Sequence, residues 1–301
     1  MFKRKITTIN FEGNQIRFLV LRGDTIRSWR TRKIPTELMS QGQIHNTDTI
    51  GNVISATIKD LKGSRRNVIS SVTGQRSVHR IMRIPNIKDK LLEETIRRKA
   101  KQEFAIPIDE TDIHWRILSR TNNQITLYVL AVPNMIVDQQ VKALKAAKIK
   151  PRVMGIKPLA LQRLVDKPSC IIVNLENYSL GVIIIINNIP ILVRSVPLET
   201  GNLTAEAKVD LLSQELARTA KYYNESNKKN RLPEETVVYL TGELFDPSQI
   251  DARLDESSDL SARLQSRTPY SVQFPKGPYP LPKKLPLPTY AVNLGLALKS
   301  K

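Results

Sequence analysis

One sequence of elements occurs twice in this chain, and that repeat constrains its fold more than any other feature. Residues 7–21 predict two β-strands around the polar turn Glu12-Gly13-Asn14-Gln15, and a third strand follows over residues 25–34. From Ser169 the plan starts again, with an apolar strand that reaches Asn174-Leu175-Glu176-Asn177, a second strand to Ile186 and a third over residues 190–196. Helices follow each meander, so the pattern indicates a two-lobed α/β protein with a weak internal duplication.

Helical periodicity fills most of the chain between the two meanders. Apolar residues spaced three or four apart predict helices over residues 48–61, 89–104 and 134–147, and after the second meander over 204–223. Residues 79–133 have the order strand, helix, strand, strand. A strand at 235–241 precedes a polar, helical stretch to about Arg267, and six prolines between Pro275 and Pro288 then predict irregular chain.

The positive charge lies almost entirely in the first half of the chain. Residues 1–152 hold 29 Lys and Arg against 13 Asp and Glu, a net of +16, whereas residues 153–301 hold 18 against 15, a net of +3. Such a field attracts nucleic acid or an anionic bilayer. Only 5% of residues are aromatic, and the basic residues do not alternate with aromatic ones, so a solvated basic face is favoured over a nucleic-acid site. A basic groove would favour an acidic or membrane-proximal peptide.

The sequence offers little that indicates catalysis. It lacks the common phosphate-binding, zinc and nucleophile motifs, and the three histidines, His45, His79 and His114, are isolated. Cys170 stands alone in an apolar run and is expected in the core. The chain has no apolar stretch of 18 residues and no signal-peptide pattern, so we expect a cytoplasmic protein without a catalytic or metal-ligating residue.

Several short segments resemble, in order, those of the PilM family of actin-like proteins, which belong to the inner-membrane platform of type IV pilus assembly. The likeness covers nearly the whole chain, although each segment alone is weak. The segments are residues 10–17, 80–85 before the predicted helix, 130–133, 157–163, Arg194 with 201–204, 240–242 and 293–298.

This resemblance implies a two-lobed actin-like, ribonuclease H-like α/β fold with four subdomains. Subdomain 1A would comprise residues 1–77 plus 151–167, and an inserted subdomain 1C would comprise residues 78–150. Subdomain 2A would comprise residues 168–204 plus 236–301. Subdomain 2B, residues 205–235, would be reduced, because the chain between Thr204 and its helix is short.

The resemblance also implies a function in protein binding. Family members are cytoplasmic scaffolds at the inner membrane that bind the N-terminal cytoplasmic tail of PilN, a membrane protein, in a groove between subdomains 1A and 1C. In this chain the basic half would carry that groove, and the tail would be extended and hydrophobic-basic or hydrophobic-polar. Contact with an anionic membrane surface and homo-oligomer formation remain open alternatives.

The resemblance finally places a nucleotide cleft whose residues depart from the expected pattern. Actin-like ATP sites use an acidic residue and a glycine on each phosphate loop, whereas the corresponding positions here are Asn10 with Glu12 and Asn174 with Glu176. Each glutamate beside a phosphate costs roughly 4 kcal/mol at about 4 Å and an effective dielectric of 20. We therefore expect a degenerate cleft without a cofactor, formed by Asn10, Glu12, Gly13, Asn14, Arg17, Asn174, Glu176, Asn177, Gly201, Asn202, Gly242 and Glu243.

Two other functions are compatible with the residues. An actin-like pilus assembly ATPase would hold ATP with Mg²⁺ in the cleft despite Glu12 and Glu176. A basic nucleic-acid-binding protein would bind with an affinity that falls steeply as salt increases.

Overall fold

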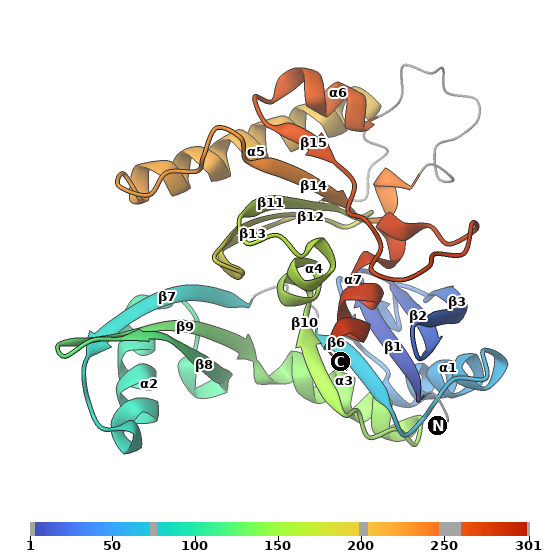
Figure 1. Ribbon diagram of the computed structural model, residues 1–301. Helices are drawn as coiled ribbons and strands as arrows, with labels where there is room; N and C mark the ends of the chain where they lie inside the picture. The colour runs from blue at the N-terminus through green and yellow to red at the C-terminus, as the bar shows by residue number, and fades with distance from the viewer. Residues whose placement is uncertain (1–3, 73–76, 199–203, 247–259, 300–301) are drawn as a thin grey trace.

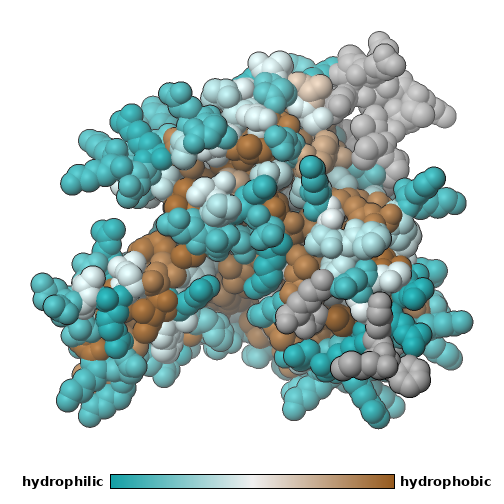
Figure 2. Space-filling model, in the orientation of Figure 1, coloured by the Kyte–Doolittle hydropathy of each residue, from teal (hydrophilic) through white to brown (hydrophobic). Residues whose placement is uncertain are grey.

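The computed structural model describes residues 4–72, 77–198, 204–246 and 260–299. It has two lobes, each built on a five-stranded sheet, and a smaller sheet inserted into the first lobe (Figure 1). Apolar side chains reach the surface mainly over the inserted sheet and between the lobes, while hydrophilic side chains cover the outer edges (Figure 2). Among the described residues, no helix is both long and apolar enough to cross a membrane.

The first lobe contains the first predicted meander. Strands β1 (Lys5–Glu12), β2 (Gln15–Arg22) and β3 (Thr25–Lys33) are antiparallel, and β6 (Val68–Val72) and β10 (Val153–Ile156) extend the sheet in parallel on the β1 side. A small hairpin of β4 (Met39–Ser40) and β5 (Gln43–Ile44) precedes helix α1 (Thr47–Asp60). Asn46 caps the N-terminus of α1, because its side chain accepts a hydrogen bond from the backbone N–H of Thr49.

The alternation of side chains along β1 and β2 decides what each face of this sheet packs against. Ile16, Phe18 and Val20 pack with α1 and with α3 (Asn134–Ala146), whereas Leu19 and Leu21 pack on the opposite face with α4 (Lys157–Val165) and α7 (Leu287–Leu298). The second face is the one that looks toward the other lobe.

The second lobe repeats this plan, as the sequence predicts. Strands β11 (Cys170–Leu175), β12 (Ser179–Ile186) and β13 (Ile189–Pro197) form the meander, and β14 (Val237–Thr241) and β15 (Ser271–Gln273) add to it in parallel. Helix α5 (Ala205–Ser226) covers the outer face, and α6 (Leu260–Arg267) contributes to the same apolar core. The predicted helical stretch before Leu260 lies partly outside the described residues.

The inserted sheet has the order β7-β9-β8, from β7 (Val78–Pro85), β9 (Gln124–Pro133) and β8 (Thr111–Arg120). Helix α2 (Leu92–Glu103) packs on it between two short 3-10 helices, η1 (Asp89–Leu91) and η2 (Ile108–Glu110). Helix α3 falls inside the range expected for subdomain 1C, but its buried residues Ala143 and Leu144 belong to the core of the first lobe. Helix α3 therefore packs on the core of the first lobe as well as beside the inserted sheet.

Helices α4 and α7 lie between the two lobes and join their cores (Figure 1). They are packed so closely that a Cβ on Gly295 of α7 would lie 1.9 Å from the carbonyl oxygen of Ala160 in α4. The sequence does not predict α7. The predicted irregular, proline-rich stretch is confirmed only up to Pro286, because α7 begins at Leu287. Cys170 is buried in the same core, as expected, and burial raises the pKa of its thiol to about 12.

Candidate functional site

The structure brings together the predicted cleft residues of the first lobe on the sheet face that looks toward the second lobe. Asn10, Glu12 and Arg17 share this face because Asn10 and Glu12 alternate with Ile9 and Phe11, and Arg17 pairs with Asn10 across β1 and β2. All three are buried, and Arg17 is fully inaccessible to solvent.

The second lobe supplies carboxylates opposite Arg17. Asn174 lies near the end of β11, Glu176 follows that strand, and Glu243 lies in η3 (Glu243–Phe245), directly after β14. Because β11 and β14 are adjacent and parallel, their ends meet at the same edge of the sheet. Both glutamates are buried there, and the sequence analysis names both.

Arg17 forms a buried ion-pair network across the two lobes. Its Nη1 and Nη2 donate hydrogen bonds to the two carboxylate oxygens of Glu176 at 3.0 and 2.7 Å, and Nη2 also lies 2.9 Å from Oε2 of Glu243. Nη1 further donates to the carbonyl oxygen of Thr289 in α7 at 3.1 Å. We call Arg17, Glu176 and Glu243 the interlobe clasp.

The polar neighbours of the clasp complete it. Oε2 of Glu243 accepts hydrogen bonds from the amides of Gln15 at 3.0 Å and Asn177 at 2.9 Å, and the backbone N–H of Glu243 donates to Glu176 at 3.2 Å. The amide of Asn293 in α7 donates to the carbonyl oxygen of Arg17 at 3.0 Å. The clasp therefore holds strands of both lobes and the helix between them.

The pKa values of the clasp follow from burial and from its charges. Burial alone would raise the pKa of Glu176, but the charge and hydrogen bonds of Arg17 outweigh it, so that pKa is lowered. The pKa of Glu243 is raised, because burial and the neighbouring Glu176 outweigh its contacts with Arg17. The pKa of Arg17 is raised despite burial, because the surrounding glutamates stabilise its charge.

The remaining cleft residues are also engaged within the protein. Glu12 forms an ion pair with Lys157, the first residue of α4, and accepts a hydrogen bond from Ser179 at 3.2 Å. Asn10 accepts from the hydroxyl of Ser71 at 2.6 Å, and Asn174 accepts from that of Thr241 at 3.1 Å.

The glycines of the cleft serve close packing of the chain on itself. Gly13 has φ +57°, and a Cβ there would lie 2.5 Å from the ring of Tyr178. Gly242 has φ +107°, and a Cβ there would lie 2.2 Å from the carbonyl oxygen of Leu175. Asn14 lies half-buried in the β1–β2 turn, and Gly201 and Asn202 lie outside the described residues.

These residues do not fit a magnesium-bound nucleotide. Three carboxylates, on Glu12, Glu176 and Glu243, face two cations, on Arg17 and Lys157, so the fully ionised site carries a net charge of −1 and repels a polyphosphate. Two buried donors, Nδ2 of Asn10 and Nε of Arg17, have no partner, and isolated buried donors of this kind are ordinarily hydrated. The charged side chains of the site instead contact one another across the two lobes.

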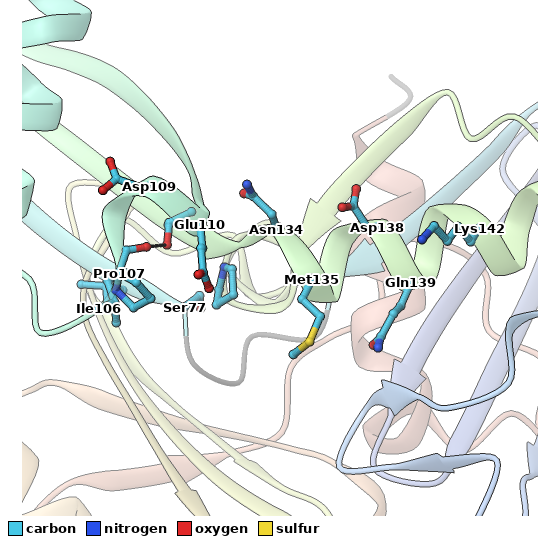
Figure 3. A pocket seen from close by; sticks show the side chains of 13 residues that line it. Ser77, Ile106, Pro107, Asp109, Glu110, Asn134, Met135, Asp138, Gln139 and Lys142 are labelled. Atoms are coloured by element: carbon cyan, nitrogen blue, oxygen red, sulfur yellow. Dashed lines mark hydrogen bonds between the residues drawn. The ribbon is translucent and has the colours of Figure 1, made fainter.

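A second candidate site is an open groove between the inserted sheet and α3 (Figure 3). It has a volume of 880 Å³ and contains apolar side chains from the segment before η2, the start of β7, the end of β9 and the start of α3. Met135 is 47% exposed in it. The lining residues are Ser77, Val78, Ile106, Pro107, Asp109, Glu110, Thr111, Pro133, Asn134, Met135, Asp138, Gln139 and Lys142.

The charge of this groove differs from that of the half of the chain that contains it. The groove lies in the basic half of the chain, but its lining holds three carboxylates, Asp109, Glu110 and Asp138, against one cation, Lys142, a net of −2. Asp109 pairs with Lys101 at 3.5 Å, whereas Glu110 and Asp138 have no ion-pair partner within the described part of the chain. The lining of the groove is therefore acidic although the half of the chain that contains it is basic, because the cations of this half lie elsewhere.

Two polar side chains of the groove also have unsatisfied oxygen atoms. Oδ1 of Asn134 and Oε1 of Gln139 are buried and accept no hydrogen bond. Buried polar atoms without a partner are costly, so these oxygens favour a ligand that brings N–H groups into the groove. Neither residue could be predicted as a site residue from the sequence, because only the fold places the first turns of α3 beside η2.

In the inserted sheet, His79 of β7 is buried and contacts two hydroxyl groups. Its Nδ1 lies 2.6 Å from the hydroxyl of Tyr128 and its Nε2 lies 3.1 Å from the hydroxyl of Ser77. Burial, aided by the positive charge of Arg80, lowers the pKa of His79 to about 4. The imidazole is therefore neutral at pH 7.

Comparison with solved structures shows the fold. A chain of the PilM-PilN type IV pilus biogenesis complex superimposes with a TM-score of 0.76 at 18% identity, covering 99% of this chain and 98% of that one. The ethanolamine utilization protein EutJ from Carboxydothermus hydrogenoformans gives a TM-score of 0.55 at 11% identity, covering 99% and 90%. The cytoplasmic domain of EpsL, from the type II secretion system of Vibrio cholerae, also gives 0.55, at 12% identity, covering 99% and 96%.

Comparison of sequences identifies the family. No curated protein matches the chain. The family model described as type IV pilus assembly protein PilM matches residues 22–198, which is more than half of the chain and includes the inserted sheet, the groove and the start of the second lobe. With its two-lobed actin-like fold, this chain belongs to the PilM family of type IV pilus assembly proteins.

Proposed function

We propose that this protein is a cytoplasmic scaffold of the type IV pilus inner-membrane platform and binds the N-terminal cytoplasmic tail of a PilN-like membrane protein. The observation that carries this proposal is the groove between the inserted sheet and α3. It is open and presents several apolar side chains, which suits a peptide better than an enclosed small molecule. The structural likeness to a chain of a PilM-PilN complex supports the same partner.

The chemistry of the groove specifies the tail. Met135, Ile106 and Pro107 offer an apolar surface for one or two hydrophobic anchors. Glu110 and Asp138 favour a basic residue beside them, and the unpaired oxygens of Asn134 and Gln139 favour donation from peptide N–H groups. The tail is therefore extended and hydrophobic-basic rather than acidic.

We further infer that the scaffold acts without hydrolysing nucleotide. The support is the interlobe clasp, which places a guanidinium and two carboxylates where the two lobes of an actin-like protein meet. These charges are compensated within the protein and leave a net negative site. An actin-like ATPase would need cations and metal ligands in their place.

The experiment is a titration of the full chain with a fluorescent synthetic peptide of the PilN-like tail, read by anisotropy. We expect saturable binding at micromolar concentrations and at least a tenfold loss for Met135→Glu. The matched control is Ile117→Glu, an equally exposed apolar residue outside the groove, which should leave the affinity unchanged. Absence of binding at tens of micromolar peptide, or an equal loss in both variants, would contradict the proposal.

A further inference from the structure

Six exposed cations gather at one corner of the first lobe, away from the groove and the clasp. Two lie at the end of α1, one precedes β6, and three lie between α3 and β10. We call them the basic corner, and they are Lys59, Lys62, Arg66, Lys148, Lys150 and Arg152.

Hydrogen bonds from neighbouring residues bring these segments together. The guanidinium of Arg65 donates to the carbonyl oxygen of Ala147 after α3 at 2.7 Å and to the hydroxyl of Ser55 in α1 at 2.8 Å. The backbone N–H of Arg152 donates to the carbonyl oxygen of Val68 at 2.8 Å, and Nζ of Lys5 donates to that of Lys62 at 2.7 Å. The ends of α1 and α3 and the start of β1 accordingly meet at one corner (Figure 1).

Helix stability accounts for only part of this charge. Lys59 lies in the last turn of α1, where a cation favours the helix dipole, but Arg66, Lys150 and Arg152 lie beyond the helix ends. The nearby carboxylate of Asp60 is already shared by Arg32 at 3.1 Å and Arg30 at 3.7 Å. The corner therefore presents uncompensated positive charge around a surface depression of 470 Å³ between Lys59 and Arg66.

We propose that the basic corner is a docking surface for a bilayer that contains anionic phospholipids. Six long cationic side chains on adjacent segments suit a plane of anionic headgroups. Each side chain should strengthen the partitioning of the protein onto the bilayer about fivefold. No aromatic side chain belongs to the corner, which disfavours the base stacking that single-stranded nucleic acid uses.

The position of the groove supports the same partner. Helix α3 contributes Met135 and Asp138 to the groove at its start and leads into Lys148 and Lys150 at its end, about 20 Å away at 1.5 Å per residue. A membrane-anchored tail in the groove would hold the corner close to the bilayer. This second argument rests on the proposed function, whereas the charge argument does not.

The experiment is co-sedimentation of the full chain, without peptide, with vesicles of phosphatidylcholine alone or with one-third phosphatidylglycerol. We expect binding only to the anionic vesicles, weakening several-fold between 50 and 300 mM salt. The variant Lys148→Gln/Lys150→Gln/Arg152→Gln should partition onto these vesicles about a hundredfold more weakly. The matched control is Lys228→Gln/Lys229→Gln/Arg231→Gln, which removes the same charge from the exposed loop after α5 and should bind as the unchanged protein does.

Two outcomes would overturn the proposal. Equal loss in both triple variants would show a response to net charge rather than to the basic corner. Tighter binding to a 20-nucleotide single-stranded DNA than to anionic vesicles in the same salt would assign the surface to nucleic acid instead. Because no peptide is present, either result is independent of whether the groove binds the tail.

Discussion

The interlobe cleft and the groove beside α3 differ in how their polar groups are satisfied. In the cleft, Arg17 forms ion pairs with Glu176 and with Glu243, and all three residues are buried. In the groove, Glu110 and Asp138 lack ion-pair partners within the described residues, and an exposed methionine lies beside them. The charges of the cleft are paired within the protein, whereas those of the groove are left for a partner in the function that we propose.

The largest expected effect is on the clasp. The variant Arg17→Met leaves two buried carboxylates without their cation, so we expect a loss of about 3–5 kcal/mol in the free energy of unfolding at pH 7. The measurement is urea denaturation of the full chain. The control Arg97→Met removes an exposed pair with Glu93 and should cost less than about 1 kcal/mol.

A triple variant distinguishes lost charge pairing from lost packing. Arg17→Met/Glu176→Gln/Glu243→Gln removes the orphaned charges, so it should recover part of the stability lost by Arg17→Met. A loss below 1 kcal/mol for Arg17→Met would mean that the clasp does not hold the lobes together.

Acid tests the burial of His79 in the inserted sheet. His79 has a pKa of about 4 in the folded protein against 6.5 unfolded, so its neutral form stabilises the fold fully above pH 6.5. This contribution is lost as pH falls from 6.5 toward 4, and the loss in unfolding free energy reaches about 2 kcal/mol by pH 5. The measurement is urea denaturation at a series of pH values. The variant His79→Phe should lose less stability over the same pH range. An equal dependence of unfolding free energy on pH in the two proteins would contradict the prediction.

A smaller effect is expected where the interlobe helices touch. Gly295→Ala would place a methyl group against the carbonyl of Ala160, and we expect it to cost about 1–3 kcal/mol in unfolding free energy. Gly181→Ala is the matched control, because its nearest contacts lie at 3.8 Å. Thermal unfolding of the two proteins should separate them, and equal midpoints would show that α4 and α7 are less tightly packed than described.

The smallest effect concerns one charge of the groove. Asp138→Asn should weaken binding of the basic tail peptide about fivefold, or about 1 kcal/mol, because one rim carboxylate is lost. Asp112→Asn, an exposed carboxylate of β8 outside the groove, should leave the affinity unchanged. Tighter binding of Asp138→Asn would indicate an acidic tail.

Much of the fold could be predicted because it follows from local patterns. The two meanders and most of the helices result from strand alternation, polar turns and apolar spacing, which the sequence displays directly. Helix α7 is different, since nearly all of its residues are buried and no polar face marks its period. Pro286 just before the helix and Pro288 within it also argue against a helix, although Pro288 lies in the first turn, where proline is tolerated.

The cleft and the groove show where prediction from sequence stops. Asn10, Glu12, Asn174 and Glu176 could be named because the repeat places them at equivalent strand ends. The ion pair between Arg17 and Glu243 could not be predicted, because these residues come from different lobes, which meet at α7. The acidic lining of the groove could not be predicted for a related reason, because the net charge over 152 residues does not tell which face carries the cations.

The most direct test of the account is one calorimetric titration of the full chain with the PilN-like tail peptide, performed with and without millimolar MgATP in moderate salt. We predict the same micromolar affinity in both, and no saturable heat when MgATP is added alone. Tail binding that requires MgATP, or saturable magnesium-dependent binding of ATP itself, would contradict the claim that the clasp has replaced the nucleotide.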